Sequence, residues 1–151
     1  SEKMESGSIY EKANAFKKKY PMTIAWRLKK NAKIIDKYLR PNEEVLYVFV
    51  AQKNNNPFDI FTTAVLALTS ERLIIGRKRV VFGYFFDSIT PDLFNDLKVL
   101  SGIIWGKIHI DTVKEYITLS NLDKAALPEI EKMIGTYMSE QKKVLNSQES
   151  I

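Results

Sequence analysis

The sequence predicts a mainly β protein in which seven short antiparallel strands follow two helices and precede a third. The first observation behind this prediction is the segment 65–79, VLALTSERLIIGRKR, in which two apolar runs flank a short polar break. Apolar residues alternate within each run, which is how a strand buries one side against a core. The second observation is that the hydrophobic period changes from helical to strand-like near residue 43 and becomes helical again near residue 126.

Length and composition limit both the size of the fold and its chemistry. A chain of 151 residues and 17.4 kDa forms one domain, with room for a small appendage. The sequence has no cysteine, which excludes disulfides, thiolate nucleophiles and cysteine-based zinc sites and fits a reducing compartment. No apolar run approaches the ~18 residues of a membrane helix. We therefore expect a cytoplasmic protein, with the inner membrane surface as an alternative location.

Positive charge is concentrated in the first third of the chain. Residues 1–42 hold 11 Lys and Arg against 4 Asp and Glu, a net charge of +7, whereas residues 43–151 carry a net charge of −2. A basic segment attached to a near-neutral body is typical of chains that meet nucleic acid or an anionic membrane. A solvated helical face explains the same charges without any ligand.

Two helices are predicted within residues 1–42, which we treat as a basic helical segment preceding the barrel. The first covers 9–19 and ends before Pro21, and the second runs from a capping Thr23 to about residue 39. The second helix has an apolar stripe made of Ile24, Leu28, Ala32, Ile35 and Leu39. Its opposite arc carries Trp26, Lys29, Lys30, Lys33, Lys37 and Arg40.

Residues 43–145 are predicted to hold the strands and a final helix, with 146–151 as a tail. The seven strands are 45–50, 61–68, 73–78, 80–86, 93–100, 103–111 and 116–119. In the sixth strand Ile104, Ile108 and Ile110 share one face. Short strands at this spacing indicate an antiparallel barrel or sandwich. The helix covers 127–144, and Pro128 suits its first turn.

Part of this segment resembles a known family. The residues Glu43-Glu44-Val45 and the run LALTSERLII at 66–75 resemble the opening of the bacterial pleckstrin-homology-like (PH-like) family. The segments 87–89 and 102–108 and the helix after 121–123 resemble its later portion. The resemblance implies a closed seven-stranded antiparallel barrel over 43–120, capped by the C-terminal helix. The core is expected to hold Leu66, Leu68, Leu73, Ile75, Ile89, Ile108, Ile110, Ile117, Ile130 and Ile134.

The resemblance implies a binding or assembly module rather than an enzyme. Eukaryotic relatives of the fold often bind phosphoinositides through several Lys and Arg in the first interstrand loop. The corresponding loop here, 52–58, offers only Lys53, so this activity is not expected.

The residues themselves also give no catalytic or metal motif. His109 is the only histidine, and it shares a strand face with Trp105 and Lys107, so we interpret it as a surface residue. Ser70 beside Glu71 is explained by its place in a turn. The sequence has no Gly-rich phosphate loop, HExxH motif or paired carboxylates. We expect no catalytic activity, no cofactor and no metal.

Two surfaces are candidates for binding. One is a cationic set in which Trp26 lies among Lys29, Lys33 and Lys37, joined by Arg77 and Arg79. The other is the aromatic fourth strand, with Phe82, Tyr84, Phe85 and Phe86. Because both faces of that strand are apolar, one of them needs a cover from the N-terminal helices or from a second copy.

These surfaces lead to two functional hypotheses. The first is a non-enzymatic module that binds protein, including copies of itself, through the aromatic face and the N-terminal helices; it predicts a particle larger than 17.4 kDa. The alternative is a peripheral binder of an anionic membrane or ligand through the face that holds Trp26. Nucleic acid is the least favoured partner.

Overall fold

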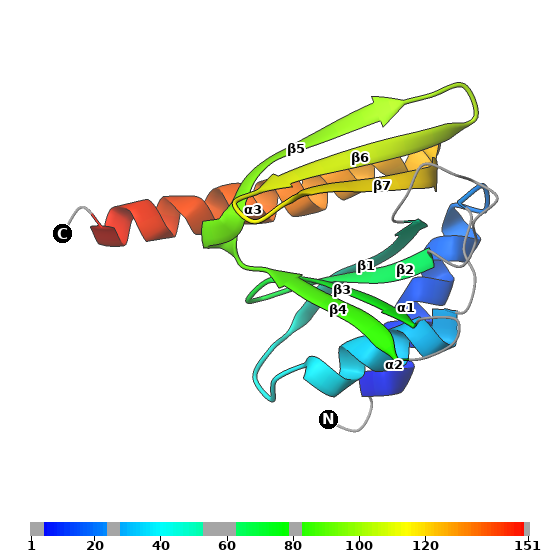
Figure 1. Ribbon diagram of the computed structural model, residues 1–151, viewed down its shortest axis with the longest axis horizontal. Helices are drawn as coiled ribbons and strands as arrows, with labels where there is room; N and C mark the ends of the chain where they lie inside the picture. Colours follow the sequence, from blue (N-terminus) through cyan, green and yellow to red (C-terminus); the bar gives the residue numbers. More distant parts are fainter. Residues whose placement is uncertain (1–4, 24–27, 53–62, 79–82, 150–151) are drawn as a thin grey trace.

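The computed structural model describes residues 5–23, 28–52, 63–78 and 83–149. Their element order is two helices, seven strands and a long final helix (Figure 1). The helices are α1 (Glu5–Lys19), α2 (Leu28–Tyr38) and α3 (Leu127–Glu149). The strands are β1 (Val45–Gln52), β2 (Thr63–Thr69), β3 (Leu73–Lys78), β4 (Tyr84–Ile89), β5 (Phe94–Ser101), β6 (Trp105–Thr112) and β7 (Tyr116–Asp123). Short 3-10 turns at Pro91–Leu93 and Lys124–Ala126 precede β5 and α3.

The seven strands are antiparallel, as predicted, in the order β4-β3-β2-β1-β7-β6-β5. β1 pairs with β7 only at Gln52 and Ser120, so the strands curl as two sheets that meet at this point. The prediction of a closed barrel was wrong, because β4 and β5 are the outer strands and form no ladder with each other in the described part of the chain. The Pro91–Leu93 turn directs β5 onto the second sheet, and the result is a curled half-barrel.

The N-terminal helices cover the first sheet on the side away from β5–β7 (Figure 1). The predicted apolar stripe of α2 is confirmed at Ala32 and Ile35, which are fully buried, and the buried face extends to Asn31 and Ile34. Gly76 on β3 permits this close contact, because a Cβ atom there would lie 2.9 Å from the Ile35 Cγ1. All residues of β2 are buried, since the strand lies beneath these helices on one face and lines the core on the other.

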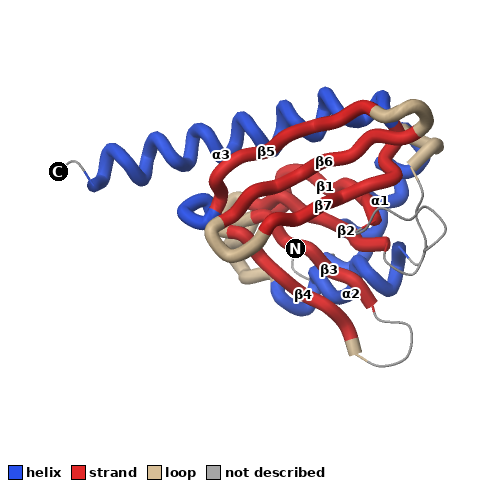
Figure 2. The backbone as a smooth tube through the Cα atoms, turned by 45° about the horizontal axis from the view of Figure 1, so that its top comes forward, coloured by secondary structure: helices blue, strands red, loops and turns tan. Residues whose placement is uncertain are grey.

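The third helix and the core agree with the sequence. All ten predicted core residues are buried, and Ile130, Ile134 and Met138 of α3 join the same cluster. Figure 1 and Figure 2 show α3 beside β5–β7, with its C-terminal end projecting beyond the sheets. The helix continues to Glu149, five residues beyond the predicted end. None of the described helices combines the length and the apolar character that crossing a bilayer requires.

Several strand boundaries differ from the prediction, most of all in β4, β6 and β7. β4 covers Tyr84–Ile89, so it continues three residues beyond its predicted end. β6 begins at Trp105, so Ile104 lies in the preceding turn and does not share the buried face of Ile108. β7 continues through Asn121, which has a positive φ of 59°, a conformation that asparagine tolerates well. Thr23 was predicted to cap the second helix; its hydroxyl accepts a hydrogen bond from the Asp123 N–H at 2.9 Å.

Truncation of a buried side chain on α3 tests whether this helix belongs to the core. We expect Ile134→Ala to lower the free energy of unfolding by about 2–5 kcal/mol, because Ile134 is fully buried and its removal leaves a cavity. Urea denaturation followed by circular dichroism measures this change. Val144→Ala is the matched control, because Val144 is half exposed on the same helix and its truncation should shift stability by only about 0.5 kcal/mol. A loss below about 1 kcal/mol for Ile134→Ala would contradict the packing.

Candidate functional site

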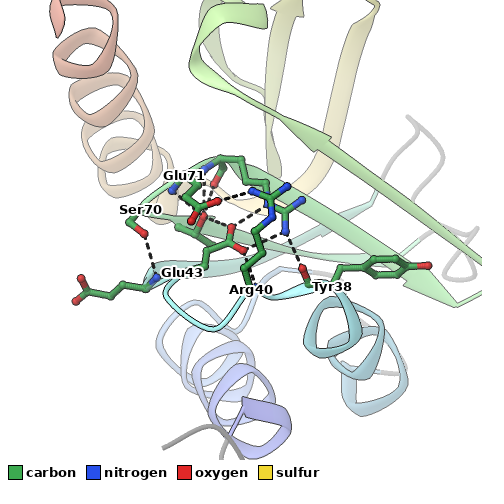
Figure 3. Close-up of polar contacts among 8 residues, drawn as sticks. Tyr38, Arg40, Glu43, Ser70 and Glu71 are labelled. Atoms are coloured by element: carbon green, nitrogen blue, oxygen red, sulfur yellow. Dashed lines mark hydrogen bonds and ion pairs between the residues drawn. The ribbon is translucent and has the colours of Figure 1, made fainter. Parts of the chain in front are cut away.

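A buried ion pair joins the start of β1 to the β2–β3 turn (Figure 3). Arg72 donates from Nε to Glu43 Oε2 at 2.8 Å and from a terminal nitrogen to Glu43 Oε1 at 3.0 Å. The Thr69 hydroxyl donates to Glu43 Oε2 at 2.6 Å. Only 6% of the Arg72 side chain and 0% of the Glu43 side chain are exposed. Burial alone would raise the pKa of Glu43, but the hydrogen bonds from Arg72 and Thr69 outweigh it, so this pKa lies below its ordinary value.

The same ion pair holds the C-terminal end of α2. Arg72 donates a further hydrogen bond to the Tyr38 carbonyl oxygen at 2.7 Å, and the Arg40 N–H donates to Glu43 Oε1 at 3.1 Å. A second ion pair, between Arg40 and Glu71, lies next to the buried pair and is exposed to solvent (Figure 3). The residues that carry the sequence resemblance therefore form a structural joint between a helix and two strand ends. Sequence reasoning found the motif but not this contact, because Glu43 and Arg72 are 29 residues apart.

A second carboxylate joins α1 to the start of α3. Glu129 accepts hydrogen bonds from Lys19 Nζ at 2.7 Å, the Tyr20 hydroxyl at 2.8 Å and the Tyr47 hydroxyl at 2.7 Å. Partial burial would raise the pKa of Glu129, yet these three donors lower it overall. Burial, together with the bond to Glu129, raises the pKa of Tyr47 above its usual range. The cluster is fully hydrogen-bonded within the protein, which indicates an anchor for α1.

The predicted cationic set is only partly described. Lys29, Lys33 and Lys37 are exposed along α2, and Lys37 Nζ lies 4.5 Å from the centre of the Tyr84 ring. Arg77 lies beside Phe85, 5.8 Å from its ring centre. Trp26 and Arg79 fall outside the described residues. Lys29, Lys30 and Lys33 form no ion pair with any residue that the structure describes.

The aromatic residues of β4 divide between its two faces. Phe86 is opposite Gly76 in the β3–β4 register, on the face covered by α2, and it stacks on Tyr38 with ring centres 4.0 Å apart. The hydroxyl groups of Tyr84 and Tyr38 are hydrogen-bonded to each other. Phe85 points to the other face and packs against the core. Phe82 lies outside the described residues. The second helix therefore covers part of the aromatic face.

The residues considered for catalysis have structural contacts. His109 stacks on Tyr116 with ring centres 5.2 Å apart and lies 3.1 Å from the Thr118 hydroxyl. The Ser70 hydroxyl accepts a hydrogen bond from the Glu44 N–H at 3.0 Å. Within the described ranges, no group of three or more His, Asp or Glu side chains could hold a metal ion.

One surface was missed by sequence reasoning. The turn between β5 and β6 exposes Ile103 and Ile104, Leu100 is exposed near the end of β5, and the nearby Met22 is exposed as well. Trp105 Nε1 donates to the Met22 carbonyl oxygen at 2.9 Å, which joins this turn to the end of α1. We call Leu100, Ile103 and Ile104 the apolar tip. In the sequence this surface is marked by Ser101-Gly102 followed by two isoleucines. The alternation of apolar residues had led us to predict that these isoleucines begin the sixth strand.

Comparison with known proteins finds a matching family model and similar solved structures. The family model described as "Bacterial PH domain" matches residues 39–136. A pleckstrin homology domain from Shewanella amazonensis SB2B has 19% sequence identity and a TM-score of 0.48, over 75% of this chain and 89% of that one. A DUF1696 family protein with a pleckstrin-homology domain from Shewanella loihica PV-4 has 14% identity and a TM-score of 0.49, over 75% and 94%. No curated protein sequence matches the chain.

Removal of the buried carboxylate tests the joint at Arg72. We expect Glu43→Gln to lower the free energy of unfolding by about 3–5 kcal/mol at pH 7, because it leaves the Arg72 charge buried without a partner. The pKa of Glu43 is lower in the folded state than its ordinary value, so its contribution to stability is present above about pH 4.3 and is lost as the pH falls through the folded-state pKa. Urea unfolding between pH 3 and 7 should show a larger loss in the wild type than in the variant, because Glu129, whose pKa is also lowered, is present in both.

Glu71→Gln is the control for that measurement. It removes the same charge from the exposed pair with Arg40, and exposed pairs contribute only about 0–1 kcal/mol. Equal effects of the two substitutions would show that the buried pair has no special role.

Proposed function

We propose that this chain, which belongs to the bacterial PH domain family, is a non-catalytic module that attaches to an anionic membrane surface through its N-terminal helices. The observation that carries the proposal is the exposed outer surface of α1 and α2. We call it the basic layer; its members are Lys18, Lys29, Lys30, Lys33 and Lys37. Among the described side chains of these helices, Glu11 is the exposed acidic residue. Such a layer attracts phosphate headgroups.

The chemistry of the layer favours a membrane over a protein partner. The apolar side chains of α2, including Ala32, Ile34 and Ile35, are buried against the chain's own sheet. Protein interfaces draw most of their affinity from a few large side chains that enter pockets, and the basic layer offers lysines instead. Each lysine near an anionic bilayer contributes about 1 kcal/mol without a defined pocket. The attachment should therefore weaken as salt shortens the ~8–10 Å screening length.

Vesicle binding by charge variants tests this proposal. We expect Lys29→Gln, Lys30→Gln and Lys33→Gln together to weaken binding to phosphatidylglycerol vesicles by about 100-fold, since about 3 kcal/mol of attraction is lost. Co-sedimentation at low salt measures this, with phosphatidylcholine vesicles as the uncharged comparison. Lys37 is left unchanged because it contacts Tyr84.

A matched control removes three charges from another element. Lys132→Gln, Lys142→Gln and Lys143→Gln on α3 change the net charge equally, so they should weaken binding much less if the basic layer is the contact. Identical losses would indicate attraction by net charge alone, and full retention of binding by the α2 variant would contradict the proposal.

Self-association is the second candidate, and the position of β4 favours it. β4 is an outer strand of the sheet, and its Tyr84 ring remains partly exposed. Outer strands can pair with another chain through their free backbone edge. On this hypothesis, size exclusion with light scattering should give a mass above 17.4 kDa that falls in a Tyr84→Asp variant. A mass of 17.4 kDa at high protein concentration would contradict it.

A further inference from the structure

We propose that the apolar tip between β5 and β6 inserts into the interface of an anionic bilayer. This inference rests on the proposed membrane attachment and names the element that would enter the lipid. Ile103 is 95% exposed, Ile104 is 54% exposed and Leu100 is 49% exposed. Exposed apolar side chains are ordinary when they are scattered. Here Ile103 and Ile104 lie on one turn and Leu100 lies near the adjoining end of β5, and this turn projects at an end of the molecule (Figure 1).

The charges around the apolar tip indicate the nature of its partner. Residues 97–108 contain Lys98 and Lys107 and no acidic residue, and Lys124 reaches the same turn. Asp123 lies at the base of the turn, where its carboxylate accepts hydrogen bonds from the backbone N–H groups of Met22 and Ala125. Apolar side chains bordered by lysines are complementary to an acyl layer beneath anionic headgroups.

Three backbone groups of the turn are already hydrogen-bonded within the protein, which lowers the cost of removing them from water. Lys124 Nζ donates to the carbonyl oxygens of Gly102 and Ile103, both at 3.1 Å. The Gly102 N–H donates to the Trp105 carbonyl oxygen at 3.0 Å. Exposed carbonyl groups are costly to remove from water unless they are hydrogen-bonded. A turn with these bonds can enter the headgroup region without first changing its conformation.

The apolar tip also adjoins a cationic part of the N-terminal helices. Trp105 is hydrogen-bonded to Met22, which follows the last turn of α1 with its Lys17, Lys18 and Lys19. Figures 1 and 2 both place the β5–β6 turn and the C-terminal end of α1 at the same end of the molecule. Tryptophan is enriched at the level of lipid headgroups, where its ring is apolar and its N–H is hydrogen-bonded. Trp105 has both features in this structure.

A single labelled cysteine gives a direct test, because the native sequence has none. We would attach an environment-sensitive fluorophore to Ile103→Cys and add phosphatidylglycerol vesicles, with and without a quencher placed in the acyl chains. Insertion predicts a blue shift and quenching. Val113→Cys is the control, because Val113 is also well exposed but lies at the other end of β6. Its label should not respond.

The unlabelled variant Ile103→Ser adds an equilibrium measurement. Because Ile103 is almost fully exposed, the substitution leaves the fold intact, and it should reduce partition onto the vesicles about tenfold or more. Val113→Ser should leave the partition unchanged.

The possible outcomes separate this inference from the function on which it rests. If the wild type binds vesicles while the Ile103 label and Ile103→Ser show no effect, the insertion is wrong and the attachment through the basic layer stands. If the wild type does not bind, both proposals fail. If the Ile103 label shifts with protein concentration in the absence of lipid, a second copy covers the apolar tip and the insertion is overturned.

Discussion

The buried ion pair between Glu43 and Arg72 is the interaction on which the position of the second helix depends. A charge without a partner in such a site would cost several kcal/mol, so each of the two residues is fixed by the other. The remaining hydrogen-bonding groups of the pair reach the Tyr38 carbonyl and the Arg40 N–H, where α2 ends. The β2–β3 turn therefore fixes the position of α2, and with it the direction in which the lysines of α2 face solvent.

A second carboxylate has the same role for the first helix. Glu129 lies at the start of α3 and binds Lys19 and Tyr20 at the end of α1, while Tyr47 brings β1 to the same point. The family match begins at residue 39, after both helices. The family model thus matches the half-barrel and the first turns of α3, whereas the basic layer lies outside the match and is held in place through two anchored carboxylates.

Both proposed contact surfaces hold exposed side chains that have no ion pair or apolar cover among the residues that the structure describes. In the basic layer, Lys29 and Lys33 face water while the apolar side of the same helix is used by the sheet. In the apolar tip, Ile103 is exposed while its backbone is hydrogen-bonded to Lys124. A bilayer offers anionic headgroups to the basic layer and an apolar interior to the apolar tip. A protein partner would instead need a surface that is complementary to both.

The sequence by itself determined the order of the elements and the core, because periodicity and turn residues are local properties. Leu66, Leu73 and Ile134 were identified as core from their spacing alone. Only the tertiary structure decided that the barrel stays open between β4 and β5, and that Ile104 lies in a turn rather than on a buried face. The pairing of Glu43 with Arg72 was equally out of reach, because contacts between residues distant in sequence depend on how whole strands and helices pack, and no local pattern records that.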